Sequence, residues 1–247
     1  MITNIFCSEI SNPILWEHSW PLLSSIDEEI SIWKFRISSN EDNLDHFKSL
    51  LNVFELKVAS KYHFEKDYNR CILGRGITKI LLAFYTSQKP KEILIDYEEN
   101  KKPFLRDSSG FNLSFNLSHS ENYILIAVGK DEIGVDIEKM KNLFEYQSLI
   151  DAIFTKEEKN FITKAPEPVK AFYLLWTRKE ALLKATGMGI VNDLNCIACL
   201  NGENKVDSAV IVSKKEWLIK SFQISNNYIA SVAYLLDKPI NFFEFSF

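Results

Sequence analysis

The sequence predicts an α+β fold of two similar halves, each a small antiparallel sheet packed against helices. Stretches with the helical period of apolar residues alternate with stretches of strand period, and the order strand, helices, strands occurs twice in the 247 residues. Short segments also repeat: EISI at 29–32 resembles EIGV at 132–135, and NYI at 122–124 recurs at 227–229. The offsets of 103 and 105 residues indicate an internal repeat.

The repeat also sets the expected domain boundaries. We expect an N-terminal half at 1–130 and a C-terminal half at 131–247. A cleft between two similar halves is a natural ligand site, so we expect the active cleft there. Because one chain supplies both halves, the repeat predicts a monomer.

The composition, with 46% hydrophobic and 25% charged residues, is that of an ordinary globular protein. A net charge of −4 gives no general attraction to nucleic acid or anionic membranes. The longest apolar stretches, 80–85 and 123–128, are far shorter than the roughly 20 residues that span a bilayer. No basic and apolar leader opens the chain. We therefore expect a cytoplasmic protein with neither a membrane nor a nucleic-acid partner.

The N-terminal half is expected to form helices followed by strands. Apolar residues at three- and four-residue steps predict one amphipathic helix over 47–62. A second helix is expected over 67–85, ended by a proline soon after. The strand period then predicts two strands in this half, at 113–118 and 123–128, and a third at 133–138 that opens the C-terminal half.

The C-terminal half repeats this order. Thr155 and Glu158 form a capping box that opens a short helix. A longer helix is expected over 167–186, with Pro168 at its start and Gly187 at its end. The remaining strand-like segments are 196–200, 210–213, 217–224 and 228–235.

Two carboxylates lie side by side on one predicted strand. The strand period over 133–138 sends Asp136 and Glu138 out of the same face as Gly134. Two such acids repel each other unless a cation lies between them, and paired oxygen ligands suit Mg²⁺ with a substrate phosphate. The alternative is a solvated strand face, on which short carboxylate pairs are common.

The helix predicted over 167–186 carries an acid and an ammonium on one face. Trp176, Glu180 and Lys184 follow at steps of four residues. An ordinary surface ion pair, which adds only about 0.3 to 0.5 kcal/mol, is the alternative explanation. Because Arg178 and Lys179 make this stretch locally basic, it could also hold a phosphate ligand.

Other polar groups could bind a phosphate. The segment NLSHS at 116–120 ends a strand with hydroxyls and an imidazole, although such a histidine can equally be satisfied locally. Arg70 and Arg75 lie on the helix predicted over 67–85, where they could also form its polar face. Cys196 and Cys199 match the CxxC spacing, but on a strand they would face opposite sides, so we expect no metal or redox role.

In combination, these motifs resemble the 4′-phosphopantetheinyl transferases. The double length and internal repeat are similar to the Sfp-type class, a monomeric pseudo-dimer that serves carrier domains. The resemblance spans about 30–234. The motifs that carry it are NLSHS at 116–120, GVDIE at 134–138, FTKEE at 154–158 and WTRKEALLK at 176–184, followed by Gly187 and Gly189.

The resemblance implies a specific reaction. A serine of an apo carrier protein attacks the β-phosphate of coenzyme A, receives the 4′-phosphopantetheine group and releases 3′,5′-ADP. The carriers would be acyl or peptidyl carrier domains of fatty-acid, polyketide or nonribosomal peptide synthases. The resemblance also implies a magnesium site formed by Asp136, Glu138 and Glu180. Glu180 further matches a residue proposed as general base, a role that metal binding weakens by lowering the pKa of a carboxyl.

The same resemblance implies the contacts with coenzyme A. Lys184 would stabilise the transferring phosphate, and His119 would reach the 3′-phosphate. The family usually shows Gly-Lys-Pro where this chain has Lys101, Lys102 and Pro103. The residues implied around the nucleotide and the pyrophosphate are Arg70, Lys102, Ser118, His119, Lys179 and Lys184.

Two other functions fit parts of the pattern. A catalytically silent relative would bind carrier proteins or coenzyme A without turnover. An unrelated Mg²⁺-dependent phosphohydrolase would use water as the acceptor and release free phosphate. The segment 30–33 carries no acids where the repeat places the acidic strand of the second half. We therefore expect a single active cleft.

Overall fold

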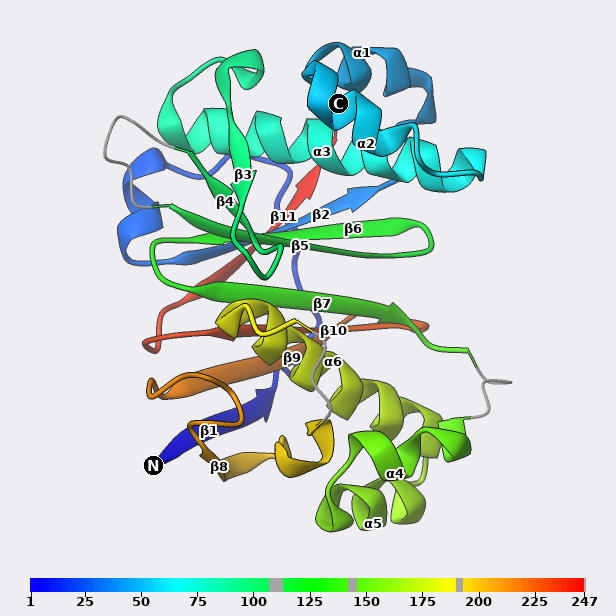
Figure 1. Ribbon diagram of the computed structural model, residues 1–247, viewed down its shortest axis with the longest axis vertical. Coiled ribbons are helices and arrows are strands. Elements are labelled where there is room, and N and C mark those ends of the chain that lie inside the picture. Colours follow the sequence, from blue (N-terminus) through cyan, green and yellow to red (C-terminus); the bar gives the residue numbers. More distant parts are fainter. Residues whose placement is uncertain (107–112, 142–145, 190–192, 247) are drawn as a thin grey trace.

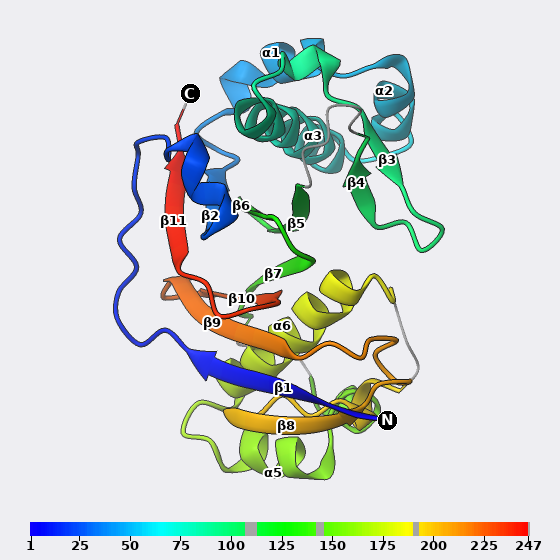
Figure 2. The ribbon, with the colours of Figure 1, turned by 90° about the vertical axis from the view of Figure 1, so that its left-hand side faces the viewer.

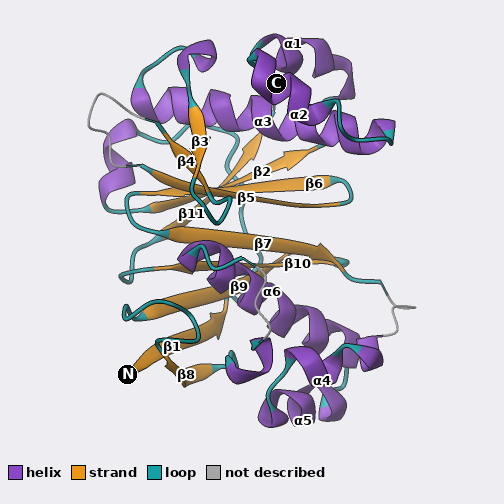
Figure 3. Ribbon diagram, in the orientation of Figure 1, coloured by secondary structure: helices purple, strands orange, loops and turns teal. Residues whose placement is uncertain are grey.

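The computed structural model describes residues 1–106, 113–141, 146–189 and 193–246, and it contains two large sheets with helices packed on them and a small two-stranded sheet of β3 and β4 (Figure 1; Figure 3). The α+β class with two helix-covered sheets is confirmed. The strands are β1 (Ile2–Glu9), β2 (Ile30–Arg36), β3 (Ile95–Tyr97), β4 (Pro103–Leu105), β5 (Ser114–Ser120), β6 (Tyr123–Gly129), β7 (Ile133–Lys139), β8 (Gly202–Asp207), β9 (Trp217–Ser225), β10 (Tyr228–Tyr234) and β11 (Ile240–Phe245). The α-helices are α1 (Leu44–Ser49), α2 (Val53–Ala59), α3 (Glu65–Thr86), α4 (Ile150–Ile153), α5 (Lys156–Lys164) and α6 (Pro168–Thr186).

The first sheet has the strand order β11-β2-β6-β5, and α3 lies across it in Figure 1. Leu73, Ile77 and Leu81 recur at four-residue steps on α3 and are completely buried. They share one hydrophobic core with inward-facing residues of β2 and β6. The predicted helix over 67–85 and the predicted strands at 113–118 and 123–128 are confirmed.

The second sheet has the order β7-β10-β9-β1-β8, and α6 packs on it. Gly134 on β7 makes this packing possible, because a Cβ there would collide with the backbone of α6 at Ala181 and Ala185. At its C-terminal end α6 stops at Gly187, which has a φ of 73°. The capping box of Thr155 and Glu158 and the predicted helix over 167–186 are confirmed. So are the strands predicted at 133–138, 217–224 and 228–235.

The terminal strands cross between the two sheets. β1 pairs with β8 and β9 of the second sheet, whereas β11 pairs with β2 of the first. Figure 2 shows the segment after β1 running along the molecule from one sheet to the other. Each sheet therefore contains one parallel pair, β1 with β9 or β11 with β2, among antiparallel ones. The division at residues 130 and 131 stays a prediction, and strand pairing crosses it at both ends of the chain.

The helix predicted over 47–62 is wrong in its continuity. Two short helices, α1 and α2, take its place. Asn52 interrupts the helix because its side chain accepts a hydrogen bond from the Glu55 amide, while the Glu55 carboxylate accepts one from the Asn52 amide. Phe54, one of the apolar residues on which the predicted helix rested, is 62% exposed.

Two predicted strands near the C-terminus are also wrong. The segment 196–200 is not a strand, since helix side chains take its backbone groups: Cys199 donates its amide to Glu158, and Arg178 donates to the Cys199 carbonyl. The segment 210–213 lies in the turn that follows β8 and at its end. The strand β8 itself was missed, because Gly202 is typical of a turn. No helix in the described part of the chain has the length and apolar character to cross a membrane.

Candidate active site

The predicted metal ligands lie where the two sheets meet. β5 is an edge strand of the first sheet and β7 an edge strand of the second, and the two run next to each other in Figure 1. Asp136 and Glu138 project from β7. Because Gly134 allows close packing of α6, Glu180 and Lys184 lie on the helix that crosses this strand.

Lys184 holds one oxygen of Asp136. Its Nζ lies 2.6 Å from Asp136 Oδ1 and 2.9 Å from Ser118 Oγ. Ser118 donates its own hydroxyl to Asp136 Oδ1 at 2.9 Å. The second oxygen of Asp136, Oδ2, is buried and has no hydrogen-bond partner among the described residues. An unpartnered buried carboxylate oxygen is costly unless a cation or a donor reaches it.

Mutual repulsion and burial disturb the neighbouring acids. Burial, together with the charges of Asp136 and Glu138, raises the pKa of Glu180 to about 7 against the attraction of Lys184. Burial and the charge of Asp136 likewise raise the pKa of Glu138. The three acids therefore form a site of excess negative charge that favours a proton or a cation. Among the described residues, no three His, Cys, Asp or Glu side chains already stand in a metal-binding cluster.

Two cavities flank this group and share Pro103 and Leu117 in their walls. The first, of about 300 Å³, is lined by Glu180, Lys184 and Lys102 among others. Lys102 donates to the Ala185 carbonyl at 2.5 Å, and burial lowers its pKa.

The second cavity, of about 320 Å³, is lined by Arg70, Arg75 and His119 among others. The alternation along β5 sends His119 to the opposite face from Ser118, which contacts Asp136 and Lys184 and lines neither cavity. Burial in the cavity, together with the cationic Arg70 and Lys184, lowers the pKa of His119 to about 4. Arg70 also pairs with Asp67 at 2.5 Å.

Lys179 does not join the other predicted site residues. It points into the core, where its Nζ pairs with Glu158 at 2.8 Å and donates to the carbonyls of Leu194 and Ile197. Both side chains of the pair are completely buried. One residue along a helix turns the side chain by about 100°, so the neighbour of Glu180 faces away from the cleft. The structure therefore places Lys179 in the core, away from the other residues that were expected to contact coenzyme A.

Comparison with known proteins decides the family. The sequence pattern of the 4′-phosphopantetheinyl transferase superfamily matches residues 132–233, and that of the N-terminal domain of 4′-phosphopantetheinyl transferases matches 33–131. The chain is 31% identical to the 4′-phosphopantetheinyl transferase HetI of a Nostoc species over 88% of its own length and 94% of the relative. This chain belongs to the 4′-phosphopantetheinyl transferase superfamily. The resemblance inferred from the motifs is confirmed.

Further relatives carry the same activity in their names. The 4′-phosphopantetheinyl transferase Sfp of Bacillus subtilis is 25% identical over 81% of this chain and 89% of that protein. A fission-yeast phosphopantetheinyl transferase named for aminoadipate-semialdehyde dehydrogenase is 29% identical over 76% of this chain. Because the family matches cover both sheets, the superfamily assignment extends over the cavities on both sides of β5.

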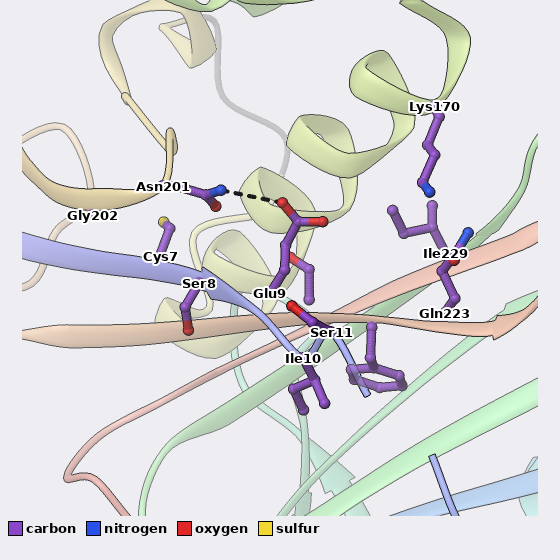
Figure 4. A pocket seen from close by; sticks show the side chains of 12 residues that line it. Cys7, Ser8, Glu9, Ile10, Ser11, Lys170, Asn201, Gly202, Gln223 and Ile229 are labelled. Carbon is purple, nitrogen blue, oxygen red and sulfur yellow. Dashed lines mark hydrogen bonds between the residues drawn. The ribbon is translucent and has the colours of Figure 1, made fainter. Parts of the chain in front are cut away.

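A further cavity of about 640 Å³ lies away from this group at the end of β1 (Figure 4). Glu9 and Lys170 line it, and Asn201 donates to Glu9 at 3.2 Å. Arg178 lies beside it, but each of its three guanidinium nitrogens already has an acceptor, Ser221 Oγ, Cys199 O or Asn201 Oδ1. This hollow brings together none of the predicted site residues.

Sequence reasoning gave no individual role to three further residues beside the candidate site. Ser120 donates to Glu138, and Asn116 accepts from the Val135 amide. Arg75 lies with its guanidinium 5.9 Å from the ring centre of Tyr97 in the second cavity. The alternating polar residues of 116–120 are a signal for the first two, whereas the contact of Arg75 with Tyr97 joins elements far apart in sequence.

Proposed function

We propose that this enzyme transfers the 4′-phosphopantetheinyl group of coenzyme A to a serine of an apo carrier protein. The carrier Ser Oγ forms a bond to the β-phosphorus, the bond from that phosphorus to the bridging oxygen breaks, and 3′,5′-ADP leaves. The proton of the serine hydroxyl passes to a base or to solvent. The observation that carries the proposal is the position of α6, whose Glu180 and Lys184 lie beside Asp136 between two cavities.

Mg²⁺ fits the acids of this site. Asp136, Glu138 and Glu180 supply the carboxylate oxygens that this ion prefers, and the unpartnered Asp136 Oδ2 is a free ligand atom. When bound, Mg²⁺ neutralises charge on the pyrophosphate and polarises its phosphoryl oxygens. In the structure described here the Lys184 ammonium performs part of that neutralisation at Asp136 Oδ1.

The basic residues divide between the two cavities. Lys102 and Lys184 would bind the pyrophosphate in the first, and Lys184 would stabilise charge on the leaving group. Arg70 and His119 would bind the nucleotide phosphate in the second. His119 is neutral at pH 7 in the free enzyme because its pKa is lowered, so it would act as a hydrogen-bond donor through one ring nitrogen.

Glu180 combines two roles that compete. A pKa near 7 suits a general base at neutral pH, but metal coordination lowers the pKa of a carboxyl and weakens it as a base. Glu180→Gln separates the roles. If Glu180 acts chiefly as a ligand, the variant loses affinity for Mn²⁺ in the absence of substrates; if it acts chiefly as a base, Mn²⁺ affinity survives and turnover is lost.

We further propose a cytoplasmic monomer whose carriers belong to fatty-acid, polyketide or nonribosomal peptide synthases.

The proposed transfer is tested by incubating the purified protein with coenzyme A, Mg²⁺ and an apo carrier protein, and recording the intact mass of the carrier. A gain of one phosphopantetheinyl group, lost with chelator, is the expected result. No gain with acyl or peptidyl carriers contradicts it. Binding of coenzyme A without transfer would favour the silent module, and free phosphate would favour a phosphohydrolase.

A further inference from the structure

The two halves meet at edge strands that do not pair through their backbones. β5 ends one sheet and β7 begins the other. An edge strand exposes unpaired N–H and C=O groups. In the antiparallel pairing of β7 with β10, alternate residues point their backbone groups away from β10. On β7 these are Val135, Ile137 and Lys139, whose amides are directed at β5.

Side chains of β5 occupy the place of the missing strand. The Val135 amide donates to Asn116 Oδ1 at 2.9 Å. The next outward amide, of Ile137, lies 3.4 Å from Ser118 Oγ, and that of Lys139 donates to Ser120 Oγ at 3.0 Å. We call Asn116, Ser118 and Ser120 the side-chain ladder. Its members are two residues apart, so they share one face of β5.

The two serines of the ladder also fix the acids. Ser118 donates to Asp136 Oδ1 at 2.9 Å, and Ser120 donates to Glu138 Oε2 at 3.0 Å. A hydroxyl has a single proton to donate. Because each hydroxyl accepts a backbone amide of β7, its proton is directed at the carboxylate one residue earlier on the same strand. The spacing between the two halves and the orientation of the acids are thus set by the same bonds.

We propose that the side-chain ladder positions the acids of β7, and that Ser120 is the positioning residue for Glu138. Ser118 also contacts Lys184, whereas Ser120 lines neither of the two cavities beside the site. Ser120 therefore acts through Glu138. The inference deepens the proposed function and rests on it, because it treats Glu138 as a metal ligand. Hydrogen bonds to a ligating carboxylate typically contribute 10- to 100-fold in metal affinity.

The test measures binding of Mn²⁺ by electron paramagnetic resonance to the full-length protein without coenzyme A or carrier. Ser120→Ala should weaken Mn²⁺ binding by about tenfold, and Ser120→Thr should restore it, because threonine keeps the hydroxyl. Ser213→Ala is the matched control. Ser213 is a half-buried serine that accepts the Lys215 amide and the Trp217 indole N–H, and it lines neither cavity. Its loss should leave Mn²⁺ affinity unchanged.

Equal Mn²⁺ affinity of Ser120→Ala and wild type would overturn the inference while leaving the proposed function intact. If the alanine variant does not fold, Ser120→Thr and Ser120→Val decide the question, since the two side chains have the same shape and differ in the hydroxyl. Equal affinities of that pair also overturn it. A wild-type protein that transfers phosphopantetheine but binds no Mn²⁺ overturns the ligand role of Glu138, and one that does neither overturns the proposed function as well.

Discussion

The two halves share the device that anchors their long helices. Asn52 and Thr155 each begin a helix with a capping box, and the glutamate of each box, Glu55 or Glu158, also binds a buried lysine of the long helix. The pairs are Lys79 with Glu55 at 2.9 Å and Lys179 with Glu158 at 2.8 Å. The capping boxes lie 103 residues apart, the offset of the sequence repeat.

The two halves differ on one pair of equivalent strands: β7 of the second half carries acids, and β2 of the first half carries none. Equivalent registers place Trp33 opposite Ile126 on β6 and Asp136 opposite Ser231 on β10. By the same offset, Phe35 corresponds to Glu138. In the first half Trp33 stacks on Phe243 with ring centres 4.8 Å apart, so aromatic packing fills the place that the acids occupy in the second half.

The outer edges of the equivalent strands differ in the same way. β11 pairs with the outer edge of β2 through its backbone, whereas the outer edge of β7 meets side chains of β5. The edge of β2 is closed by β11, a continuous strand with aromatic side chains. The edge of β7 contacts the polar side chains of β5 and lies next to two cavities. Under the proposed function, the same scaffold supports aromatic packing at one strand and chemistry at the equivalent strand.

The largest expected effect concerns the anchoring that both halves share. Lys79→Met and Lys179→Met should each lower the free energy of unfolding by about 3–5 kcal/mol, because each leaves a buried glutamate without its cation. Denaturant unfolding measures both. Where Lys179→Met is folded, its KM for coenzyme A should equal that of wild type. A raised KM for coenzyme A in Lys179→Met, with unchanged stability, would instead place Lys179 among the residues that contact coenzyme A.

The next effect separates the equivalent strand positions. Asp136→Asn should reduce kcat for transfer by about a hundred- to a thousandfold, because it removes a carboxylate ligand of the Mg²⁺ that would neutralise the reacting phosphates. Trp33→Phe changes the corresponding position and should lower stability with kcat unchanged. Transfer assays at saturating coenzyme A and thermal unfolding of both variants provide the comparison. A larger loss of kcat in Trp33→Phe than in Asp136→Asn would refute the assignment of chemistry to the second half.

A pH dependence should follow from the acids of the second half. The raised pKa of Glu180, about 7, means that this carboxyl holds a proton below pH 7. A metal ion must displace that proton, so Mn²⁺ affinity should fall by about tenfold per unit as the pH drops below 7 and level off above it. Titrations at several pH values measure this. An affinity that is constant between pH 5.5 and 8 speaks against it, and Glu180→Gln should weaken the dependence.

The smallest effect is expected at the second cavity. His119→Ala should raise the KM for coenzyme A by roughly tenfold, the loss of about one hydrogen bond to a phosphate, with little change in kcat. Dephospho-coenzyme A is the matched substrate, because it lacks the 3′-phosphate assigned to His119. If His119→Ala raises the KM for dephospho-coenzyme A by the same factor as the KM for coenzyme A, His119 does not bind the 3′-phosphate.

Local patterns predicted the parts of the site that local geometry determines. The strand period identified the common face of Asp136 and Glu138, and the helical period put Glu180 and Lys184 together. The break at Asn52 was also visible as a capping-box spacing, but the apolar pattern on both sides of it favoured one long helix. The exchange of β1 and β11 between sheets has no local signal, because each strand pairs with a partner far away in the sequence.

The buried lysines were beyond sequence reasoning for a similar reason. In the sequence, Lys179 lies on a locally basic helix, as a phosphate-binding residue would. Only the fold brings Glu158 of a neighbouring helix next to it in the core. Only part of the side-chain ladder was visible in the sequence. The alternation of polar residues in 116–120 predicted their shared face, while the edge of β7 that they meet became apparent only in the fold.

The stoichiometry of Mn²⁺ binding tests most directly whether only one half carries the chemistry. The measurement is a titration of the purified protein, followed by electron paramagnetic resonance, for wild type and Asp136→Ala. The account predicts one tight site per chain in the wild type and none in Asp136→Ala. A second site of equal affinity, or a single site that survives loss of Asp136, would contradict it.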